Sequence, residues 1–178
     1  MPFNLVTAAL LTAAVALQAG DERPQSPAAP AITEISEADC QDSGRRTALL
    51  GDLDAVIEPT SSYGQALNSY NERLMEWRND QFVRAGRWAE GDAARFAAAL
   101  LQDPEFANAA QSGLTLAEQV LAPATSAADE SKPPLERCHS LIRLQSIFGD
   151  ILRAVQQQWS VADARYAAEA RRLGVTID

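Results

Sequence analysis

The residues on which most catalytic and metal centres are built are scarce in this 178-residue chain, which has one histidine, two cysteines and two methionines. A zinc site needs three or four good ligands. A serine or cysteine nucleophile system would have to be built on His139. A haem held between Met75 and His139 would lack the Cys-x-x-Cys-His attachment motif. We therefore expect no metal and no cofactor, with Met75 packed in a core and His139 at a helix surface or partly buried.

The sequence also lacks the other patterns that indicate an enzyme. It has no glycine-rich loop for binding phosphate or a dinucleotide. Carboxylates do recur at Glu72, Glu76 and Asp80, which their four-residue spacing places on one helix face. They could form a glycosidase-like acid–base pair, but neighbouring arginines favour a solvated, charge-compensated face. The sequence therefore predicts a protein that is not an enzyme.

Lysine is nearly absent too: Lys132 is the only one among fifteen basic residues, and twenty-four acidic residues give a net charge of −9. This balance excludes nucleic acid as a partner, because phosphates bind to basic surfaces, and it disfavours an anionic membrane surface. The charge is also uneven. Residues 20–42 carry six acids and one arginine, whereas residues 137–173 carry six arginines and three acids. Either the two stretches face each other, or the acidic one is where a basic partner binds.

Charge is missing altogether from the first 19 residues, where the segment Phe3–Leu17 is mostly Leu, Val and Ala. An apolar run of about 15 residues followed by small residues is typical of a secretory signal peptide, although no Lys or Arg precedes it here. The run is shorter than the ~20 residues that cross a membrane. We predict a signal peptide at residues 1–19, cleaved after Ala19. The mature protein would then be periplasmic or secreted, without membrane insertion.

The two cysteines are Cys40 and Cys138. An even number of cysteines in an exported protein indicates disulfide bonding. Because two cysteines allow only one intramolecular pairing, we predict a Cys40–Cys138 disulfide. Two free buried thiols or an intermolecular bond are the alternatives.

Two segments interrupt an otherwise helical pattern. Residues 20–34 contain Pro24, Pro27 and Pro30 and have little to bury, which predicts a flexible tether. Residues 122–134 are rich in Pro, Ala and Ser and predict a loop. We expect the remainder, residues 35–178, to form a single domain around that loop.

Outside these segments, the alternating and β-branched runs that indicate strands are scarce. A first helix is expected to begin at Ser36, with Asp39 in a capping arrangement, and to end before Pro59. Two long helices are predicted at about 61–88 and 135–173, each with apolar residues at alternating three- and four-residue spacing. Several shorter helices lie between them. The sequence therefore predicts an all-α helical bundle.

Aromatic residues make up only 6% of the chain. Five of them are candidate contact residues: Trp88, Tyr63, Tyr70, Trp159 and Tyr166. The last four fall in two stripes, one on each long helix. A stripe at helical spacing is most simply part of a core, but it can also line a sugar- or peptide-binding groove. Trp88 is off the stripe and beside glycines, which makes it the best candidate for an exposed contact.

These features favour an exported, non-enzymatic helical-bundle protein that acts through protein–protein contacts, as an accessory or scaffold subunit. Its partner would be another envelope protein, and a basic one if the acidic stretch forms the contact. A bundle that binds a small molecule or glycan through the aromatic stripe is the first alternative. An acidic inhibitor or immunity protein for a basic target is the second. An exposed apolar surface would favour a protein partner, and a deep pocket with converging polar groups would favour a ligand.

Overall fold

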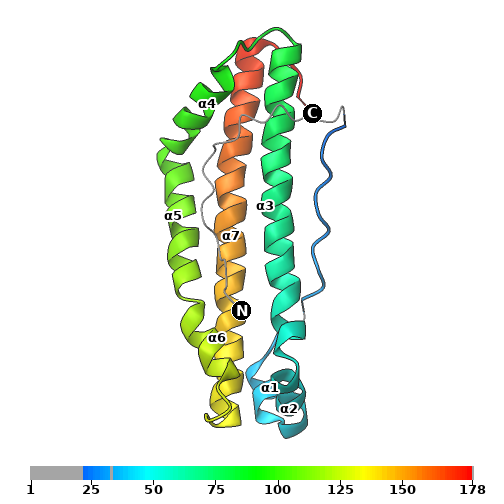
Figure 1. Ribbon diagram of the computed structural model, residues 1–178, viewed down its shortest axis with the longest axis vertical. Coiled ribbons are helices and arrows are strands. Elements are labelled where there is room, and N and C mark those ends of the chain that lie inside the picture. The colour runs from blue at the N-terminus through cyan, green and yellow to red at the C-terminus, as the bar shows by residue number, and fades with distance from the viewer. Residues whose placement is uncertain (1–21, 33, 178) are drawn as a thin grey trace. The chain divides into compact units, whose positions relative to one another are not determined.

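The computed structural model describes residues 22–32 and 34–177 (Figure 1), so the predicted signal peptide at residues 1–19 lies outside the described residues. The described part of the chain forms helices and no strand, which confirms the predicted all-α class. The helices are α1 (Glu37–Gln41), α2 (Ser43–Gly51), α3 (Leu53–Arg84), α4 (Asp92–Leu101), α5 (Pro104–Glu118), α6 (Leu121–Ala128) and α7 (Pro134–Leu173).

The chain divides into two compact units, and the two long helices α3 and α7 contribute to both. Unit 1 contains Leu67–Gln111 and Ala154–Asp178, together with the described residues up to Pro27. Unit 2 contains Ala28–Ala66 and Ser112–Arg153. The expectation of a single domain over residues 35–178 stays a prediction.

The segment predicted as one helix over residues 36–58 is divided among three helices. Its start is confirmed: the Ser36 hydroxyl accepts the Asp39 N–H, and the Asp39 carboxylate accepts the Ser36 N–H. Asp42 then ends α1 and caps α2, and Asp52 separates α2 from α3. Each of these two aspartates accepts a backbone N–H in the first turn of the helix that follows it. An aspartate that caps a new helix competes with continuation of the old one, so the prediction of one unbroken helix was wrong.

The first long helix, predicted over residues 61–88, is α3 and begins before Pro59, which was expected to end the preceding helix. Proline removes one intrahelical hydrogen bond. The helix nevertheless continues through Pro59, whose ring is partly buried. At its other end α3 stops short of Trp88, because Gly86 takes a left-handed backbone conformation, with φ at +64°, and turns the chain.

The loop predicted at residues 122–134 was wrong over its first half, where the chain forms α6. Pro123 lies in the first turn of this helix, where a missing N–H costs nothing, and the many alanines favour helix. The second long helix, predicted over residues 135–173, is confirmed as α7, which begins at Pro134 and ends at Leu173.

Unit 1 has an aromatic core that joins α3, α4 and α7. The ring centroids of Phe82 and Trp88 lie 4.5 Å apart, and those of Phe96 and Tyr166 lie 4.6 Å apart. Tyr166 is 1% exposed, and its hydroxyl donates to the Asn79 side-chain oxygen at 2.7 Å. Tilted aromatic pairs at such distances stabilise a core beyond the burial of their surface.

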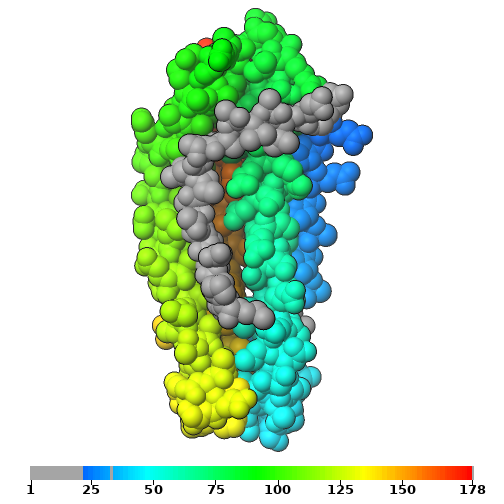
Figure 2. All heavy atoms as spheres, viewed as in Figure 1, coloured from blue at the N-terminus to red at the C-terminus, as the bar shows by residue number. Residues whose placement is uncertain are grey.

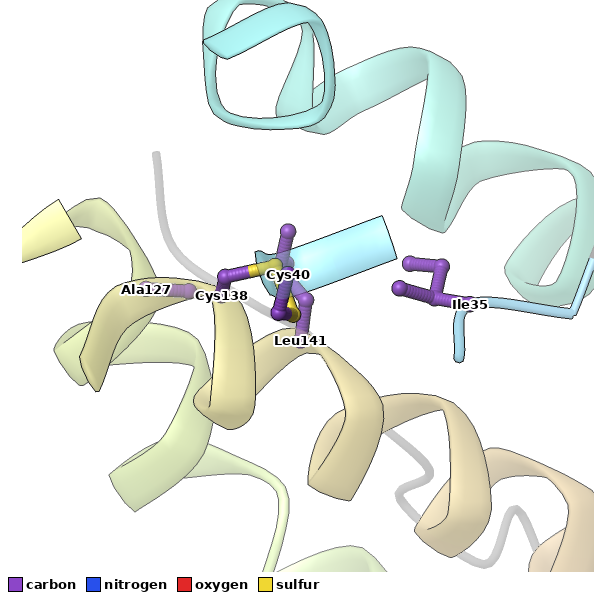
Figure 3. Close-up of a cluster of buried hydrophobic side chains, with 5 residues drawn as sticks. All are labelled: Ile35, Cys40, Ala127, Cys138 and Leu141. Carbon is purple, nitrogen blue, oxygen red and sulfur yellow. A yellow bond between two sulfur atoms is a disulfide. The ribbon is translucent and has the colours of Figure 1, made fainter. Parts of the chain in front are cut away.

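Unit 2 has the disulfide inside its core. Cys40 of α1 and Cys138 of α7 are bonded to each other and fully buried, beside Ile35, Ala127 and Leu141 (Figure 3). The predicted Cys40–Cys138 disulfide is therefore present, with the two Cα atoms 5.6 Å apart. A second buried cluster of this unit consists of Val120, Leu144, Ile147 and Phe148, with partly buried neighbours on α3, α5, α6 and α7.

Residues 22–32 form an extended segment at the molecular surface, blue in Figure 2. Pro24, Pro27 and Pro30 are partly buried, whereas the residues between them are exposed. A three-residue period is that of a polyproline II helix, so the three prolines share one face. The prediction that residues 20–34 form a flexible tether stays a prediction, and residues 20, 21 and 33 lie outside the described residues.

Candidate binding groove

Unit 2 has an open groove of about 430 Å³, which is lined by residues 31, 32, 34 and 35, by Asp39 of α1, by helix α2 and by the first turns of α3. Most of the lining residues are apolar, namely Ala31, Ile32, Ile35, Ala48, Leu49, Ala55, Val56 and Pro59. The other lining residues are charged, namely Glu34, Asp39, Arg45 and Asp52. The groove therefore combines an apolar surface with carboxylates.

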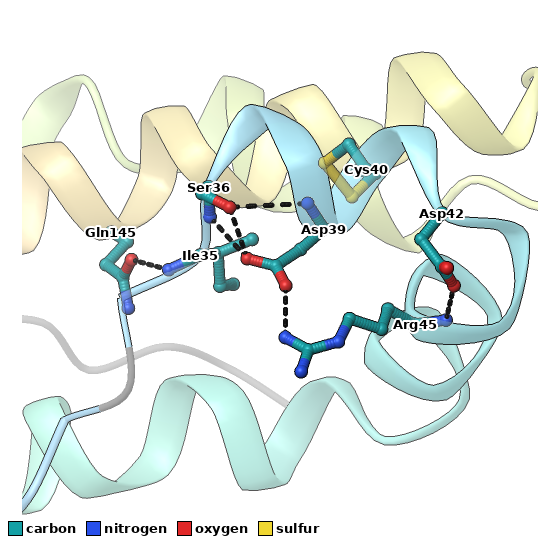
Figure 4. Close-up of polar contacts among 8 residues, drawn as sticks. Ile35, Ser36, Asp39, Cys40, Asp42, Arg45 and Gln145 are labelled. Carbon is teal, nitrogen blue, oxygen red and sulfur yellow. Dashed lines mark hydrogen bonds and ion pairs between the residues drawn. A yellow bond between two sulfur atoms is a disulfide. The ribbon is translucent and has the colours of Figure 1, made fainter.

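The extended wall of the groove is fixed at Ile35. The Ile35 N–H donates to the Gln145 side-chain oxygen of α7 at 2.8 Å, and the Ile35 side chain is 7% exposed (Figure 4). The capping box at Ser36 follows immediately, and the Cys40–Cys138 disulfide ties α1 to α7 within the same unit. The end of this wall is therefore held by a hydrogen bond, buried apolar surface and a covalent bond.

The opposite wall is built on the core of unit 2. Leu49 of α2 and Val56 of α3 are partly buried and pack against the cluster that contains the disulfide. The Asp52 carboxylate lies between these two helices and accepts the Ala55 N–H at 3.1 Å. The lining thus consists of side chains that the core holds in place, together with a carboxylate that has a structural partner.

An ion pair crosses from α1 to α2 at the groove (Figure 4). The Arg45 guanidinium donates to the Asp39 carboxylate at 2.5 Å. Hydrogen bonds from the Ser36 hydroxyl and N–H, followed by the bond from Arg45, lower the pKa of Asp39 to about 2. Asp39 is therefore ionised at neutral pH, and Arg45 compensates its charge. Glu34 and Asp52 contact no cation among the described residues, so the lining as a whole is negative.

The backbone of the extended wall is available for hydrogen bonding. Ala31, Ile32 and Glu34 lie outside any helix or strand, in a segment that runs extended in Figure 1, and their N–H and C=O groups hydrogen-bond to no other residue in the part of the chain that the structure describes. Ile32 is 38% exposed. An extended segment in this state can pair with another extended segment.

The structure corrects the prediction for Trp88, which is 7% exposed rather than a surface contact. Its ring packs between Phe82 and Phe96, and its indole N–H donates to Glu169 at 3.2 Å. Tyr166 is likewise in the core of unit 1. The other three predicted contact residues, Tyr63, Tyr70 and Trp159, are partly buried. None of the five lines the groove of unit 2.

Unit 1 has a smaller hollow, of about 240 Å³, beside Trp88. Its charged side chains pair with one another, since Arg95 bonds Asp92 and Arg172 bonds Glu169. These internal pairs satisfy the carboxylates that line it, so this hollow is the weaker candidate for a binding site.

No helix in residues 22–32 and 34–177 is long and apolar enough to cross a membrane. Over the same ranges, no group of three or more His, Cys, Asp and Glu side chains is placed to hold a metal ion. The fold and the groove together define an all-α, disulfide-bonded protein with an open, acidic apolar groove. Comparison of the chain with protein-family models, curated proteins and solved structures gives no match.

Proposed function

We propose that this protein is an exported, non-enzymatic accessory or scaffold protein of the cell envelope, and that it holds a partner protein through the groove of unit 2. The observation that carries the proposal is the open apolar lining, in which Ile32 is 38% exposed although it lies close to Ile35, which the core anchors. Exposed apolar surface of this kind is typical of sites that bind other proteins.

The disulfide supports the proposed location of the protein outside the cytosol. Buried disulfides persist in oxidising compartments and are rare in the reducing cytosol. Cys40 and Cys138 are both fully buried and bonded, which agrees with the export that we infer from the N-terminal sequence.

The burial of Trp88 and Tyr166 favours this proposal over a glycan-binding bundle. A sugar site needs aromatic rings that a ligand can reach. Trp88 and Tyr166 are less than 10% exposed and their polar atoms already have partners within unit 1. None of the five aromatic candidates lines the groove, so the proposed contact relies on aliphatic side chains and carboxylates.

A substitution that fills the groove tests the proposal. Ala48 is exposed on α2 and lines the groove, so Ala48→Gln keeps the helix and places a longer side chain in the partner's path. In pull-downs from envelope extract, the wild-type chain should retain a partner that Ala48→Gln loses. Ala94→Gln, at an exposed alanine of α4 in unit 1, is the matched control and should retain it. Equal recovery by all three chains would contradict the proposal.

A further inference from the structure

We infer that the groove of unit 2 binds an extended segment of the partner protein in which apolar side chains flank a lysine or arginine. The inference rests on the proposed function and specifies the chemistry of the segment that is bound. Three independent properties of the groove carry it: its apolar lining, the free backbone of one wall, and its negative charge.

The apolar lining requires apolar side chains in the partner. Ile32, Leu49 and Val56 reach the groove from three different elements, and all three retain accessible surface. Covering such surface with aliphatic groups removes it from water, which is favourable. A purely charged segment would leave this surface hydrated and would gain nothing from it.

The extended wall selects an extended partner. The N–H and C=O groups of Ala31, Ile32 and Glu34 are unbonded within the described chain, and they lie in the stretch that ends at the anchored Ile35. A strand laid beside them can exchange main-chain hydrogen bonds, as in recognition by strand addition. A helical partner cannot, because its own backbone groups are already bonded to one another.

The charge of the lining selects a basic residue. The groove has three carboxylates, Glu34, Asp39 and Asp52. Its one guanidinium, that of Arg45, already forms an ion pair with Asp39. Glu34 and Asp52 therefore remain to attract a cation. A lysine or arginine between two apolar side chains places its charge near these carboxylates while its neighbours cover the aliphatic surface.

The same observations disfavour a second copy of this chain as the occupant. Each copy has a net charge of −9 and a groove of the same sign, so two copies repel each other. Acidic carboxylates equally disfavour an anionic membrane surface. The partner is therefore a different protein, with a basic and apolar recognition segment.

Synthetic peptides test this inference directly. The full exported chain, labelled with ¹⁵N, would be titrated with a short peptide in which two leucines flank an arginine. Shifts of the amide signals should concentrate at residues 31–35, in α2 and at the start of α3. Replacing the arginine by glutamate should weaken binding at least tenfold, because like charges then meet. Replacing both leucines by serine, or methylating the peptide's backbone nitrogens, should also weaken it.

Variants of the protein assign the charge effect to particular carboxylates. Glu34→Gln and Asp52→Asn each keep the size of the side chain, and the amide oxygen that Asp52→Asn leaves in place can still accept the Ala55 N–H. Each should raise the Kd of the arginine peptide about two- to fivefold, as expected for one exposed ion pair. Added salt should reduce the difference in Kd between the wild type and each variant. Glu90→Gln, at an exposed position of unit 1, is the matched control and should leave the Kd unchanged.

Several results would overturn the inference. One is equal affinity for the arginine and glutamate peptides, and another is a set of signal shifts centred on unit 1. A third is concentration-dependent dimerisation that Ala48→Gln abolishes, which would make a second copy the occupant. If no peptide binds while Ala48→Gln still loses its partner in the pull-down, the peptide chemistry is wrong although the proposed function stands.

Discussion

At the scale of single residues, Tyr166 is an aromatic side chain for which the sequence allowed two interpretations, a place in the core or a place in a ligand-binding groove. Its ring is stacked with that of Phe82 at a centroid distance of 6.4 Å, and the Arg78 guanidinium lies 5.3 Å from its centroid. Burial raises the pKa of Tyr166 well above its usual range, while Arg78 and the hydrogen bond to Asn79 act in the opposite direction. The hydroxyl is therefore a protonated donor inside the core.

Removing that hydroxyl should cost a measurable part of the folding free energy. We expect Tyr166→Phe to lower the free energy of unfolding by about 1 kcal/mol, because it deletes one hydrogen bond and leaves Asn79 without its donor. Urea denaturation measures the change. Tyr70→Phe is the control, since the Tyr70 hydroxyl has no partner among the described residues, and it should change stability by less than about half that amount. Equal losses in the two variants would contradict this account of Tyr166.

The raised pKa of Tyr166 also predicts a loss of stability in alkali. The folded protein keeps this proton at pH values where the unfolded chain releases it, so the contribution is complete below about pH 10, the ordinary pKa of tyrosine, and declines above it. Above about pH 10 the free energy of unfolding should therefore fall more steeply in the wild type than in Tyr166→Phe. Parallel pH profiles of the two proteins would show that Tyr166 is not the residue responsible.

At the scale of helices, local signals predicted the ends of α7, whereas the breaks at Asp42 and Asp52 and the helix α6 were missed. The ends of α7 follow from Pro134 in its first turn and from Gly174, whose φ of +65° closes it, and both signals are local. Trp88 was misread because glycines usually mark an exposed turn. Here the turn brings the chain back against α3, where the backbone N–H of Trp88 donates to the carbonyl oxygen of Phe82.

The groove could not have been predicted from the sequence as a set of residues. Its extended wall is anchored by the bond between Ile35 and Gln145, which are 110 residues apart, and no local pattern indicates that pairing. The acidic stretch over residues 20–42 contributes Glu34 and Asp39 to the lining, and its role as the contact for a basic partner stays a prediction.

Pro59 offers a test at the same scale, because it lies inside α3 and also lines the groove. Pro59→Ala restores a backbone N–H that can bond the carbonyl oxygen four residues earlier. We expect the free energy of unfolding to rise by about 1–3 kcal/mol, the helix gain being offset in part by the greater freedom of the unfolded chain. Thermal melts followed by circular dichroism measure it. A lower melting temperature would mean that the apolar contacts of the proline ring outweigh the missing hydrogen bond.

At the scale of the whole molecule, the disulfide and the two long helices stabilise the chain in different ways. The Cys40–Cys138 bond lies within unit 2 and closes a stretch with a sequence separation of 98. In the chain-entropy model, a closed loop of this length stabilises the folded state by about 4–5 kcal/mol. The helices α3 and α7 contribute to both units, whereas α1 is only five residues long and depends on the bond, its capping box and the burial of Cys40.

This difference predicts that breaking the disulfide loosens unit 2 before unit 1. Hydrogen–deuterium exchange read by mass spectrometry would compare the oxidised protein with the reduced one, and with a Cys40→Ser, Cys138→Ser double variant that needs no reductant. Amides of α1 and α2 should exchange much faster in both, because an isolated five-residue helix is unstable in water. Amides near Phe82 and Tyr166, in the core of unit 1, should keep most of their protection. The groove should open as well, so the arginine peptide should bind the oxidised form more tightly. Equal loss of protection in both units would mean instead that the chain unfolds as one cooperative body, with the disulfide stabilising all of it.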